Sequence, residues 1–357
     1  MVKILVVTDP TSQPLWEEDF KKCLGNLYAS QQIRYINPRL DGPTAIRTQT
    51  QVVQGVREAR GDPEQLKNEM GDTEVLVVEF APVTEAVINS GKGLKLVAST
   101  RGGPVNVDVK AAAKKNILVT HTQGRLAQPV SDHAMGLILA EARNIARSYA
   151  AIRDGTFFSD PNIRAKWHRI PEMEGKTLGI VGFGNVGREV AKRAAGFGMN
   201  IIAYDPYVKE EDGKKLGVKM VSLEDLMKES DFVTVHAREA PETFHLINKD
   251  RINLMKPTAY VINTSRGSII DEKALYEAAK DGKITGVALD VYEDEPLKAS
   301  NPLIKLENVT LTPHTAGGSD RARERSILLT TIIVSKYVRG EKLTPMDIID
   351  PEKALTD

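Results

Sequence analysis

One stretch of this chain, residues 178–187 (LGIVGFGNVG), constrains the fold more than any other. An apolar run rich in β-branched residues breaks into Gly-x-Gly-x-x-Gly, and a helical pattern follows. A second apolar run then ends in Asp205, 18 positions after the last glycine. The glycines alone could form a plain turn, but strand, turn, helix, strand and terminal acid together are typical of a βαβ unit that binds a dinucleotide.

Each glycine has a separate part in such a site. We expect the cofactor to contact Gly182, Gly184, Asn185, Val186 and Gly187. Gly182 permits the tight turn, Gly184 lets the backbone approach a pyrophosphate, and Gly187 lets the helix pack closely on the strand. The pyrophosphate then lies at the helix N-terminus, where free N–H groups and the helix dipole favour negative charge.

The acidic residue selects the kind of dinucleotide. Asp205 can accept hydrogen bonds from both hydroxyls of the adenosine ribose, whereas its charge repels a 2′-phosphate. The predicted cofactor is therefore NAD rather than NADP.

Composition excludes several classes of protein. Because Lys+Arg and Asp+Glu both number 48, no global basic field recruits nucleic acid or an anionic membrane. A lone cysteine, Cys23, allows neither an internal disulfide nor a thiol–metal cluster, and we expect no metal site. No run reaches the roughly 18 apolar residues that a membrane helix needs. We expect a soluble, cytoplasmic protein.

Strand-like runs alternate with helical patterns along the chain. The runs that resemble strands are 3–7, 32–36, 74–80, 94–99, 117–120, 177–181, 201–204, 232–236, 259–263, 286–289 and 309–311. The helical patterns include 82–89, 107–115, 223–229 and 272–281, with longer helices at 130–146 and 320–339. This alternation predicts right-handed βαβ units in parallel sheets. The fold class is therefore α/β, with doubly wound, Rossmann-like or flavodoxin-like domains.

The length of 357 residues suggests two domains, because one domain usually takes about 100–200 residues. The predicted substrate domain is discontinuous and spans residues 1–122 and 314–357, and the predicted nucleotide domain spans 123–313. We expect the active site in the interdomain cleft. Residues 38–62 look like an irregular loop with a short helix, and the tail after Gly340 looks like a strap or a partly disordered end.

Three polar segments each follow a strand of the second series. They are 263–267, 290–296 and 312–318, and they contain Arg266, Glu295 and His314. Because strand carboxyl ends of an open α/β sheet face the ligand crevice, these three side chains are expected to converge. An arginine can hold a carboxylate through paired N–H groups, and a histidine oriented by a carboxylate can transfer a proton at neutral pH.

Each of these residues also has a plain structural interpretation. Arg266 could cap a strand end in an ion pair, Glu295 could belong to a solvated acidic run with Glu293 and Asp294, and His314 could be a loop residue. Their settings, Asn-Thr-Ser-Arg-Gly, Asp-Glu-Pro and Thr-Pro-His-Thr-Ala-Gly, favour catalysis. The remaining histidines are expected to be mainly structural, with His236 near the cofactor: His121, His133, His168, His236 and His245.

In combination, these motifs closely resemble the D-isomer-specific 2-hydroxyacid dehydrogenase family. The resemblance covers nearly the whole chain, is strongest from 130 to 318, and includes residues 178–187, 235–248, 263–267, 288–296 and 312–317. It implies an NAD-dependent oxidoreductase that interconverts a D-2-hydroxy acid and its 2-oxo acid. The chain looks like a phosphoglycerate dehydrogenase without the regulatory C-terminal domain, and the resemblance also implies a homodimer formed through the NAD domains. The helix at 130–146 would contribute to the dimer, or would only form the core of one subunit.

The resemblance also implies a role for particular residues. Arg266 binds the substrate carboxylate and carbonyl, His314 is the acid/base, and Glu295 is the partner of that histidine. Asp290 contacts the nicotinamide carboxamide. Further cofactor contacts are expected at His236, Ala237, Thr243, Thr264 and Gly317, and the substrate loop supplies Arg101, Gly102, Gly103 and Val105.

Two departures from the family pattern leave the substrate open. The loop reads Gly102-Gly103-Pro104-Val105, where the family commonly has Gly-Val-Gly or Gly-Ala-Gly, and Pro104 removes a backbone donor and fixes φ. Residues 120–130 lack the usual Asn-Thr-Pro-Gly form, so a bulky polar or phosphorylated substrate that uses Arg101 or Arg125 is one possibility. A non-enzymatic NAD sensor resembling the transcriptional corepressors of this fold, and a formate- or phosphite-type dehydrogenase, are the alternatives.

Overall fold

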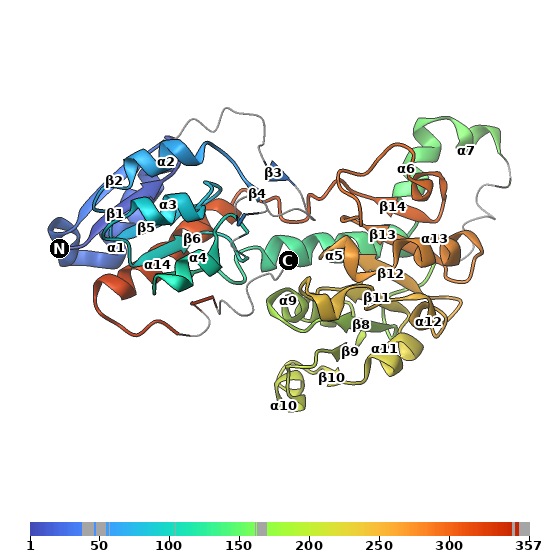
Figure 1. Cartoon of the computed structure of the whole chain (residues 1–357). Helices are drawn as coiled ribbons and strands as arrows, with labels where there is room; N and C mark the ends of the chain where they lie inside the picture. Colours follow the sequence, from blue (N-terminus) through green and yellow to red (C-terminus); the bar gives the residue numbers. More distant parts are fainter. Residues whose placement is uncertain are drawn as a thin grey trace. The chain divides into compact units, whose positions relative to one another are not determined.

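The chain forms two compact units in a computed structural model (Figure 1). The structure describes residues 1–37, 46–47, 55–56, 58–103, 105–160, 162, 170–344 and 347–349. Unit 1 comprises Met1–Arg125 and Ser319–Asp357, and unit 2 comprises Leu126–Gly318. The predicted boundaries fall after residues 122 and 313, which is three and five residues before the ends at Arg125 and Gly318. His314 therefore belongs to unit 2, whereas the prediction assigned it to the substrate domain. Pro104 and His168 lie outside the described residues.

Unit 1 is built on a five-stranded parallel sheet in the order β2-β1-β5-β6-β7. Its strands are β1 (Lys3–Val7), β2 (Gln32–Ile36), β5 (Val75–Val78), β6 (Leu96–Ser99) and β7 (Leu118–Thr120). Every residue of β5 and β6 is buried, as expected for parallel strands covered on both faces. This strand order is flavodoxin-like. A short antiparallel pair, β3 (Ile46–Arg47) and β4 (Glu58–Ala59), lies in the stretch where we predict an irregular loop.

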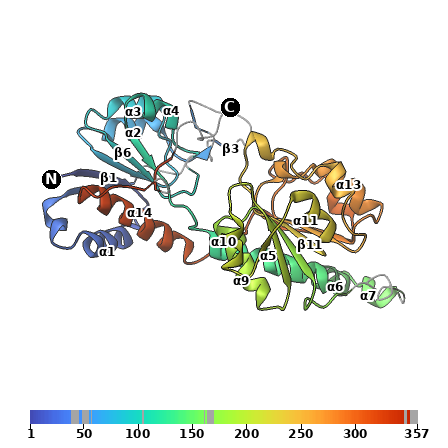
Figure 2. The ribbon, with the colours of Figure 1, turned by 90° about the horizontal axis from the view of Figure 1, so that it is seen from below.

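Helices cover both faces of this sheet (Figure 2). On one face lie α1 (Gln13–Leu24), followed by the 3-10 helix η1 (Gly25–Ser30), and α14 (Ala322–Val338). On the other lie α2 (Pro63–Glu69), α3 (Glu85–Ser90) and α4 (Val109–Lys114). The last helix packs Ile327 and Val334 into the same core as Trp16 and Phe20. Beyond it, the Ile349 N–H donates to the Val119 carbonyl, so this part of the tail runs along the edge strand.

Unit 2 is built on a seven-stranded parallel sheet in the order β10-β9-β8-β11-β12-β13-β14. Its strands are β8 (Thr177–Val181), β9 (Asn200–Tyr204), β10 (Lys219–Met220), β11 (Phe232–Val235), β12 (Tyr260–Asn263), β13 (Gly286–Leu289) and β14 (Val309–Leu311). The order reverses between β8 and β11, which is the switch point where ligands bind in Rossmann-like sheets.

Two layers of helices bury this sheet (Figure 1). One core joins the strands to α5 (Ala127–Ala142) and α9 (Asn185–Ala195). The other joins them to α11 (Leu223–Glu229), α12 (Lys249–Ile252) and α13 (Glu272–Lys280). The remaining elements are α6 (Ile145–Arg153), α7 (Thr156–Ser159), α10 (Glu210–Lys214), η2 (Pro241–Thr243), η3 (Gly267–Ile269) and η4 (Pro302–Lys305).

The long helix predicted at 130–146 is wrong, because two helices occupy this stretch. α5 ends at Ala142, and Asn144 takes the left-handed conformation (φ 55°) before α6 begins. Asparagine tolerates that conformation better than most residues. The break lets Arg147 of α6 fold back onto the buried carboxylate of Glu141, which also accepts a hydrogen bond from Thr310. In the part of the chain that is described, no helix is long and apolar enough to cross a membrane.

Candidate active site

The glycine turn after β8 is shaped by packing. Gly182 has a φ of 92°, and a Cβ atom there would lie 2.4 Å from the Ala237 backbone nitrogen. A Cβ at Gly187 would lie 2.3 Å from the Gly182 carbonyl oxygen, so neither position admits a side chain. A Cβ at Gly184 would meet nothing within 4 Å. Two glycines are therefore required by the protein itself, and the third leaves open space beside the backbone.

The open space lies at the N-terminus of α9. Gly184 and Asn185 are exposed, Val186 is half-buried, and no side chain caps the helix. The first N–H groups of a helix have no partner inside it, so they are available to an anion. Asp205 lies beside this turn, where its two carboxylate oxygens accept hydrogen bonds from the N–H groups of Phe183 and Tyr207, each at 2.9 Å. A carboxylate has about four acceptor positions, so both oxygens can still receive ribose hydroxyls.

Two buried polar atoms directly after β11 and β12 have no hydrogen-bond partner among the described residues: His236 Nδ1 and Thr264 Oγ1. His236 Nε2 lies 2.9 Å from Thr234 Oγ1, and burial lowers the pKa of this histidine to about 3, so its ring is neutral. Buried polar atoms are normally paired, and a bound ligand is one way to pair them. The glycine turn, the open helix end, Asp205 and these two atoms fit a dinucleotide.

Thr243, another predicted cofactor contact, is engaged within its own loop. Its hydroxyl accepts from the Ala240 N–H at 2.8 Å and lies 2.7 Å from the Arg238 carbonyl oxygen. These bonds hold η2 in shape beside Ala237. A cofactor contact by Thr243 stays a prediction.

A polar pair on this sheet edge joins His314 to Glu295. His314 Nδ1 lies 2.7 Å from Glu295 Oε2, and the side chains are 45% and 15% exposed. Burial opposes ionisation of Glu295, but hydrogen bonds from His314 and the Tyr292 N–H, with the charges of His314 and Arg266, together lower its pKa below the usual value. An ionised Glu295 holds the ring in one orientation through Nδ1.

The loop that carries His314 is fixed by a buried carboxylate. Asp290, fully buried, accepts hydrogen bonds from the Thr312 hydroxyl at 2.6 Å, the Thr315 N–H at 2.9 Å and the Ala316 N–H at 2.8 Å. These bonds explain why His314 belongs to unit 2. The predicted contact of Asp290 with the nicotinamide stays a prediction, because its carboxylate already has partners in the His314 loop. At the end of that loop, a Cβ at Gly317 would lie 3.0 Å from Leu126 Cδ1.

Arg266 is exposed at the end of β12, and the residues around it shape its turn. Asn263 donates to the Arg266 carbonyl at 2.9 Å and accepts from the Ser265 N–H at 3.0 Å. A Cβ at Gly267 would lie 1.9 Å from the Tyr292 carbonyl carbon, so this turn packs directly on the segment that leads to Glu295. Neither Asn263 nor Gly267 was among the predicted site residues, although the Asn-Thr-Ser-Arg-Gly motif contains both.

Arg266, Glu295 and His314 thus come from the carboxyl ends of three neighbouring strands, β12, β13 and β14. The structure brings these predicted residues to one edge of one sheet. The arrangement offers a guanidinium for an anion, a histidine for a proton, and a carboxylate that orients the histidine.

The predicted substrate loop follows β6 in unit 1. Gly102 accepts a hydrogen bond from His121 Nδ1 at 2.8 Å, and the Val105 N–H donates to Gly103 at 2.9 Å. The Arg101 guanidinium lies over the Phe80 ring, 5.4 Å from its centre. The loop is therefore held against the ends of β5 and β7.

A charged cluster surrounds the end of β5 in the same unit. Burial raises the pKa of Glu79, although the charges of Arg323, Arg125 and Arg101 oppose the rise. Burial and the charge of Arg101 lower the pKa of Arg125 to about 10. Within the described part of the chain, Arg125 Nε is buried without a hydrogen-bond partner. Glu79 was not predicted from the sequence, and its only signal is a charged residue directly after a buried strand.

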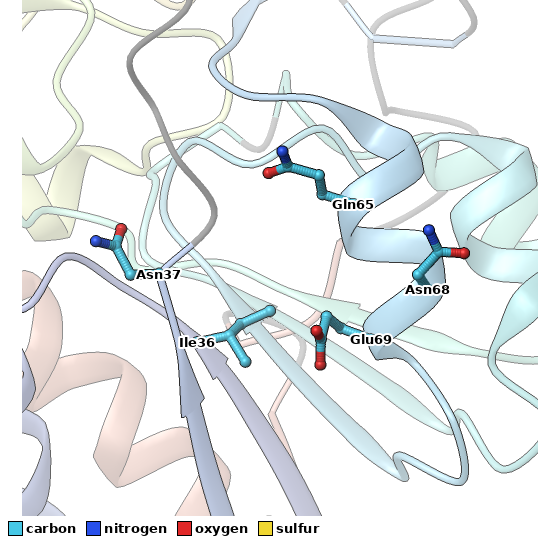
Figure 3. A pocket seen from close by; sticks show the side chains of 5 residues that line it. All are labelled: Ile36, Asn37, Gln65, Asn68 and Glu69. Atoms are coloured by element: carbon cyan, nitrogen blue, oxygen red, sulfur yellow. The ribbon is translucent and has the colours of Figure 1, made fainter.

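A separate hollow of about 260 Å³ lies in unit 1 between the end of β2 and α2 (Figure 3). Its lining is mostly polar and consists of Ile36, Asn37, Gln65, Asn68 and Glu69. None of the predicted site residues lines it. The described residues also contain no group of three His, Cys, Asp or Glu side chains that could hold a metal ion.

Known proteins share both the motifs and the fold. Residues 135–316 match the model of the D-isomer specific 2-hydroxyacid dehydrogenase NAD binding domain. A glyoxylate reductase of Korarchaeum cryptofilum is 40% identical over 275 residues, which is 76% of this chain and 80% of that protein. A D-3-phosphoglycerate dehydrogenase of Methanocaldococcus jannaschii is 41% identical over 78% of this chain but only 52% of that protein.

The solved structures agree. A D-lactate dehydrogenase from Aquifex aeolicus, complexed with NAD and lactic acid, is 30% identical and aligns with a TM-score of 0.67 over 95% of this chain and 96% of its own. The family model covers the residues that form the glycine turn and the polar strand ends. The chain belongs to the D-isomer-specific 2-hydroxyacid dehydrogenases, a family of NAD-dependent oxidoreductases.

Proposed function

We propose that this protein interconverts a D-2-hydroxy acid and its 2-oxo acid, with Arg266, Glu295 and His314 as its catalytic residues. The observation that carries the proposal is the 2.7 Å pair between His314 and Glu295 beside Arg266, at the carboxyl edge of an NAD-binding sheet. When bound, reduced NAD supplies a hydride to the carbonyl carbon.

His314 supplies the proton in the reducing direction. Glu295 occupies Nδ1, so Nε2 is the nitrogen left to donate to the carbonyl oxygen. The pKa of Glu295 is lowered, so its carboxylate accepts from Nδ1 and keeps Nε2 turned toward the transfer. In the oxidising direction the neutral ring accepts the hydroxyl proton at Nε2. A positioned acid/base of this kind typically contributes a factor of about 10²–10⁴.

Arg266 binds the substrate carboxylate. A guanidinium can donate two parallel N–H bonds to a carboxylate, which fixes its orientation as well as its charge. The exposure of Arg266 leaves the guanidinium accessible, while Asn263 and Gly267 hold its backbone. In the substrate loop, the Arg101 and Val105 N–H groups already donate to Ser99 and Gly103, so we propose that the N–H groups of Gly102 and Gly103 contact the substrate.

Only chemical reasoning limits which 2-oxo acid is the substrate. The relatives are named for glyoxylate, phosphoglycerate and lactate, which share the 2-oxo or 2-hydroxy acid group and differ beyond it. The cluster of Arg101, Arg125 and Glu79 in unit 1 supports a substrate with a polar group beyond that acid.

NADH oxidation against a panel of 2-oxo acids tests the proposal. The panel contains glyoxylate, pyruvate, hydroxypyruvate, phosphohydroxypyruvate and longer sugar-derived acids, each with the wild type and His314→Gln. We expect turnover of at least one acid that the variant loses while still binding NADH. If every acid is inert although NADH binds, the proposal fails, and an NAD sensor or an enzyme for an inorganic anion takes its place.

We also propose a homodimer formed through unit 2. Helix α6 presents Ile145, Tyr149 and Ile152 to solvent on one face, and α7 exposes Phe158. Exposed apolar groups that cluster in this way usually mark an interface. Light scattering after gel filtration is expected to give twice the 39.2 kDa chain mass, and Tyr149→Glu with Ile152→Glu is expected to give the monomer mass. A monomeric wild type would overturn the dimer.

A further inference from the structure

Unit 2 holds a second His–Glu pair close to the first. His245 Nε2 forms a hydrogen-bonded ion pair with Glu293, and the two side chains are 31% and 33% exposed. His245 has a left-handed backbone (φ 47°), as does His314 (φ 54°). The two histidines therefore pair with glutamates that lie only two positions apart, Glu293 and Glu295.

The backbone of His245 lies against the turn that carries Arg266. The His245 N–H donates to the Ser268 carbonyl at 2.8 Å, and the Ile247 N–H donates to Ile269 at 3.0 Å. The Ser268 hydroxyl also donates to Glu239 at 2.6 Å. The segment that contains His245 is thus paired with the residues directly after Arg266.

Glu293 is held on its other side. Its N–H donates to a Glu272 carboxylate oxygen at 3.0 Å, and the other oxygen of Glu272 accepts from Asn301 at 2.8 Å. Gly267 packs directly on the backbone between Tyr292 and Glu293. Glu293 therefore lies between the Arg266 turn and the start of α13, and its side chain bonds to His245. We call this closed set of contacts among His245, Ser268, Gly267 and Glu293 the circuit around Arg266.

A left-handed backbone is uncommon for a residue other than glycine, and it persists only where the surroundings impose it. Here the Ser268 carbonyl, the Glu293 carboxylate and the Phe244 ring, stacked 4.0 Å from the His245 ring, impose it together. Ion pairs that are one-third exposed contribute little to stability. The circuit therefore fixes a local geometry more than it stabilises the fold.

We propose that His245 and Glu293 are positioning residues for the reaction. Their ion pair locks the Arg266 turn against the segment that carries Glu295, so the carboxylate-binding guanidinium and the proton-transferring His314 keep a fixed spacing. The proposal rests on the proposed function, because it assigns the pair to the same catalytic set. Neither residue contacts the substrate.

The first experiment compares His245→Ala and Glu293→Ala with the wild type on the best 2-oxo acid. Since misplacement by about 1 Å can cost up to 10²-fold, we expect the KM for the oxo acid to rise roughly tenfold. The kcat is expected to change less than the KM, and the NADH Kd and the Tm are expected to stay close to those of the wild type. His245→Gln, which keeps a hydrogen-bond donor, is expected to restore part of the KM.

Lys249→Ala is the matched control. Lys249 pairs with Glu277 between α12 and α13, is more exposed to solvent than His245, and is not part of the circuit around Arg266. Its removal is expected to leave KM and kcat unchanged. An equal rise in KM for this variant would overturn the proposal.

A double-mutant cycle tests whether the pair acts through Arg266. Because residues of one network are not additive, His245→Ala is expected to add little to the KM of an Arg266→Lys variant. Three results would each overturn the proposal. They are additive effects on KM in the double variant, an unchanged KM in both alanine variants, and a lower Tm with weaker NADH binding in place of the KM change. If the wild type turns over no 2-oxo acid, the proposed function fails first, so the two failures are distinguishable.

Discussion

The carboxyl edges of the two sheets differ in how their charges are held. In unit 2, Asp290 accepts hydrogen bonds from Thr312, Thr315 and Ala316 of one loop, and Glu295 is paired with His314. In unit 1, Glu79 and Arg125 are half-buried close to other charges, and Arg125 Nε has no partner within the described residues. Around His314 the edge of unit 2 is organised before any ligand arrives. The cluster in unit 1, like His236 Nδ1 and Thr264 Oγ1 at the cofactor end of unit 2, keeps atoms without a partner among the described residues, which a ligand can satisfy.

This difference matches two separate tasks. Proton and hydride transfer need donors fixed in advance, because reorganisation during the reaction raises the barrier. Selection of a substrate can instead use polar groups whose burial is relieved by the right partner, since an unpaired buried group is costly. Under the proposed function, unit 2 supplies the proton-transfer chemistry and the charged cluster of unit 1 contributes to the choice of acid.

The largest expected effect comes from the pre-organised edge. His314→Gln should lower kcat by about 10²–10⁴, the range for a positioned acid/base, while the NADH Kd stays within twofold. Stopped-flow NADH oxidation and fluorescence titration measure the two quantities. A kcat close to that of the wild type would show that His314 is not the acid/base. The contrast between the two sheet edges would then lose its main support.

Asp290→Asn tests whether the His314 loop depends on its buried carboxylate. The new amide presents a donor to the N–H groups of the loop and leaves at least one unsatisfied, which should destabilise unit 2 by about 1–3 kcal/mol. Thermal unfolding and kcat are both expected to fall. Asp294→Asn, which affects only an exposed pair with Lys298, is the control and should change neither. Unchanged unfolding in Asp290→Asn would show that the loop is held by other contacts.

Asp205→Asn probes the cofactor end of the same edge. The amide keeps the shape of the side chain but removes the charge that repels a 2′-phosphate, so the ratio of kcat/KM for NADH to that for NADPH should fall roughly 10–100-fold. Steady-state kinetics with both cofactors measure the ratio. An unchanged ratio would mean that other residues set the preference.

The smallest expected effect concerns Glu79 in unit 1 and appears as a pH dependence. Burial raises the pKa of Glu79 above 4.5, so between the unfolded and folded values the folded protein binds more protons. The contribution of Glu79 to the free energy of unfolding therefore falls as the pH rises from its unfolded pKa to its folded pKa. Glu79→Gln should be as stable as the wild type well below pH 4.5 and more stable above it, by Tm across pH 4–8. The opposite trend would show that its arginine neighbours outweigh burial.

Most of the fold could be predicted from the sequence because parallel strands covered on both faces are continuous apolar runs. The runs at 3–7 and 177–181 coincide with β1 and β8. The two-residue strand β10 was missed, since so short a run has no periodicity. The helix break at Asn144 was also missed, because the apolar pattern of 130–146 continues through it and the contact of Arg147 with Glu141 that accompanies the break appears only in the fold.

The candidate site was predictable only in part. The motifs identify Arg266, Glu295 and His314, but they do not tell which side chain each one contacts. His245 is expected to be structural from its position in the sequence, and its ion pair with Glu293 appears only in the fold. The hydrogen bonds of Asp290 to the His314 loop likewise depend on how β13 and β14 pair.

The sequence by itself determined the α/β class, the glycine turn and the acid that follows β9, because each of these features depends on residues that are close together in the chain. Only the tertiary structure decided the pairs: His314 with Glu295 across 19 positions, Asp290 with Ala316 across 26, and His245 with Glu293 across 48. The physical reason is that hydrogen bonds and ion pairs act over a few ångströms. The order of the strands brings these distant residues into contact, and that order is set by the packing of the whole sheet.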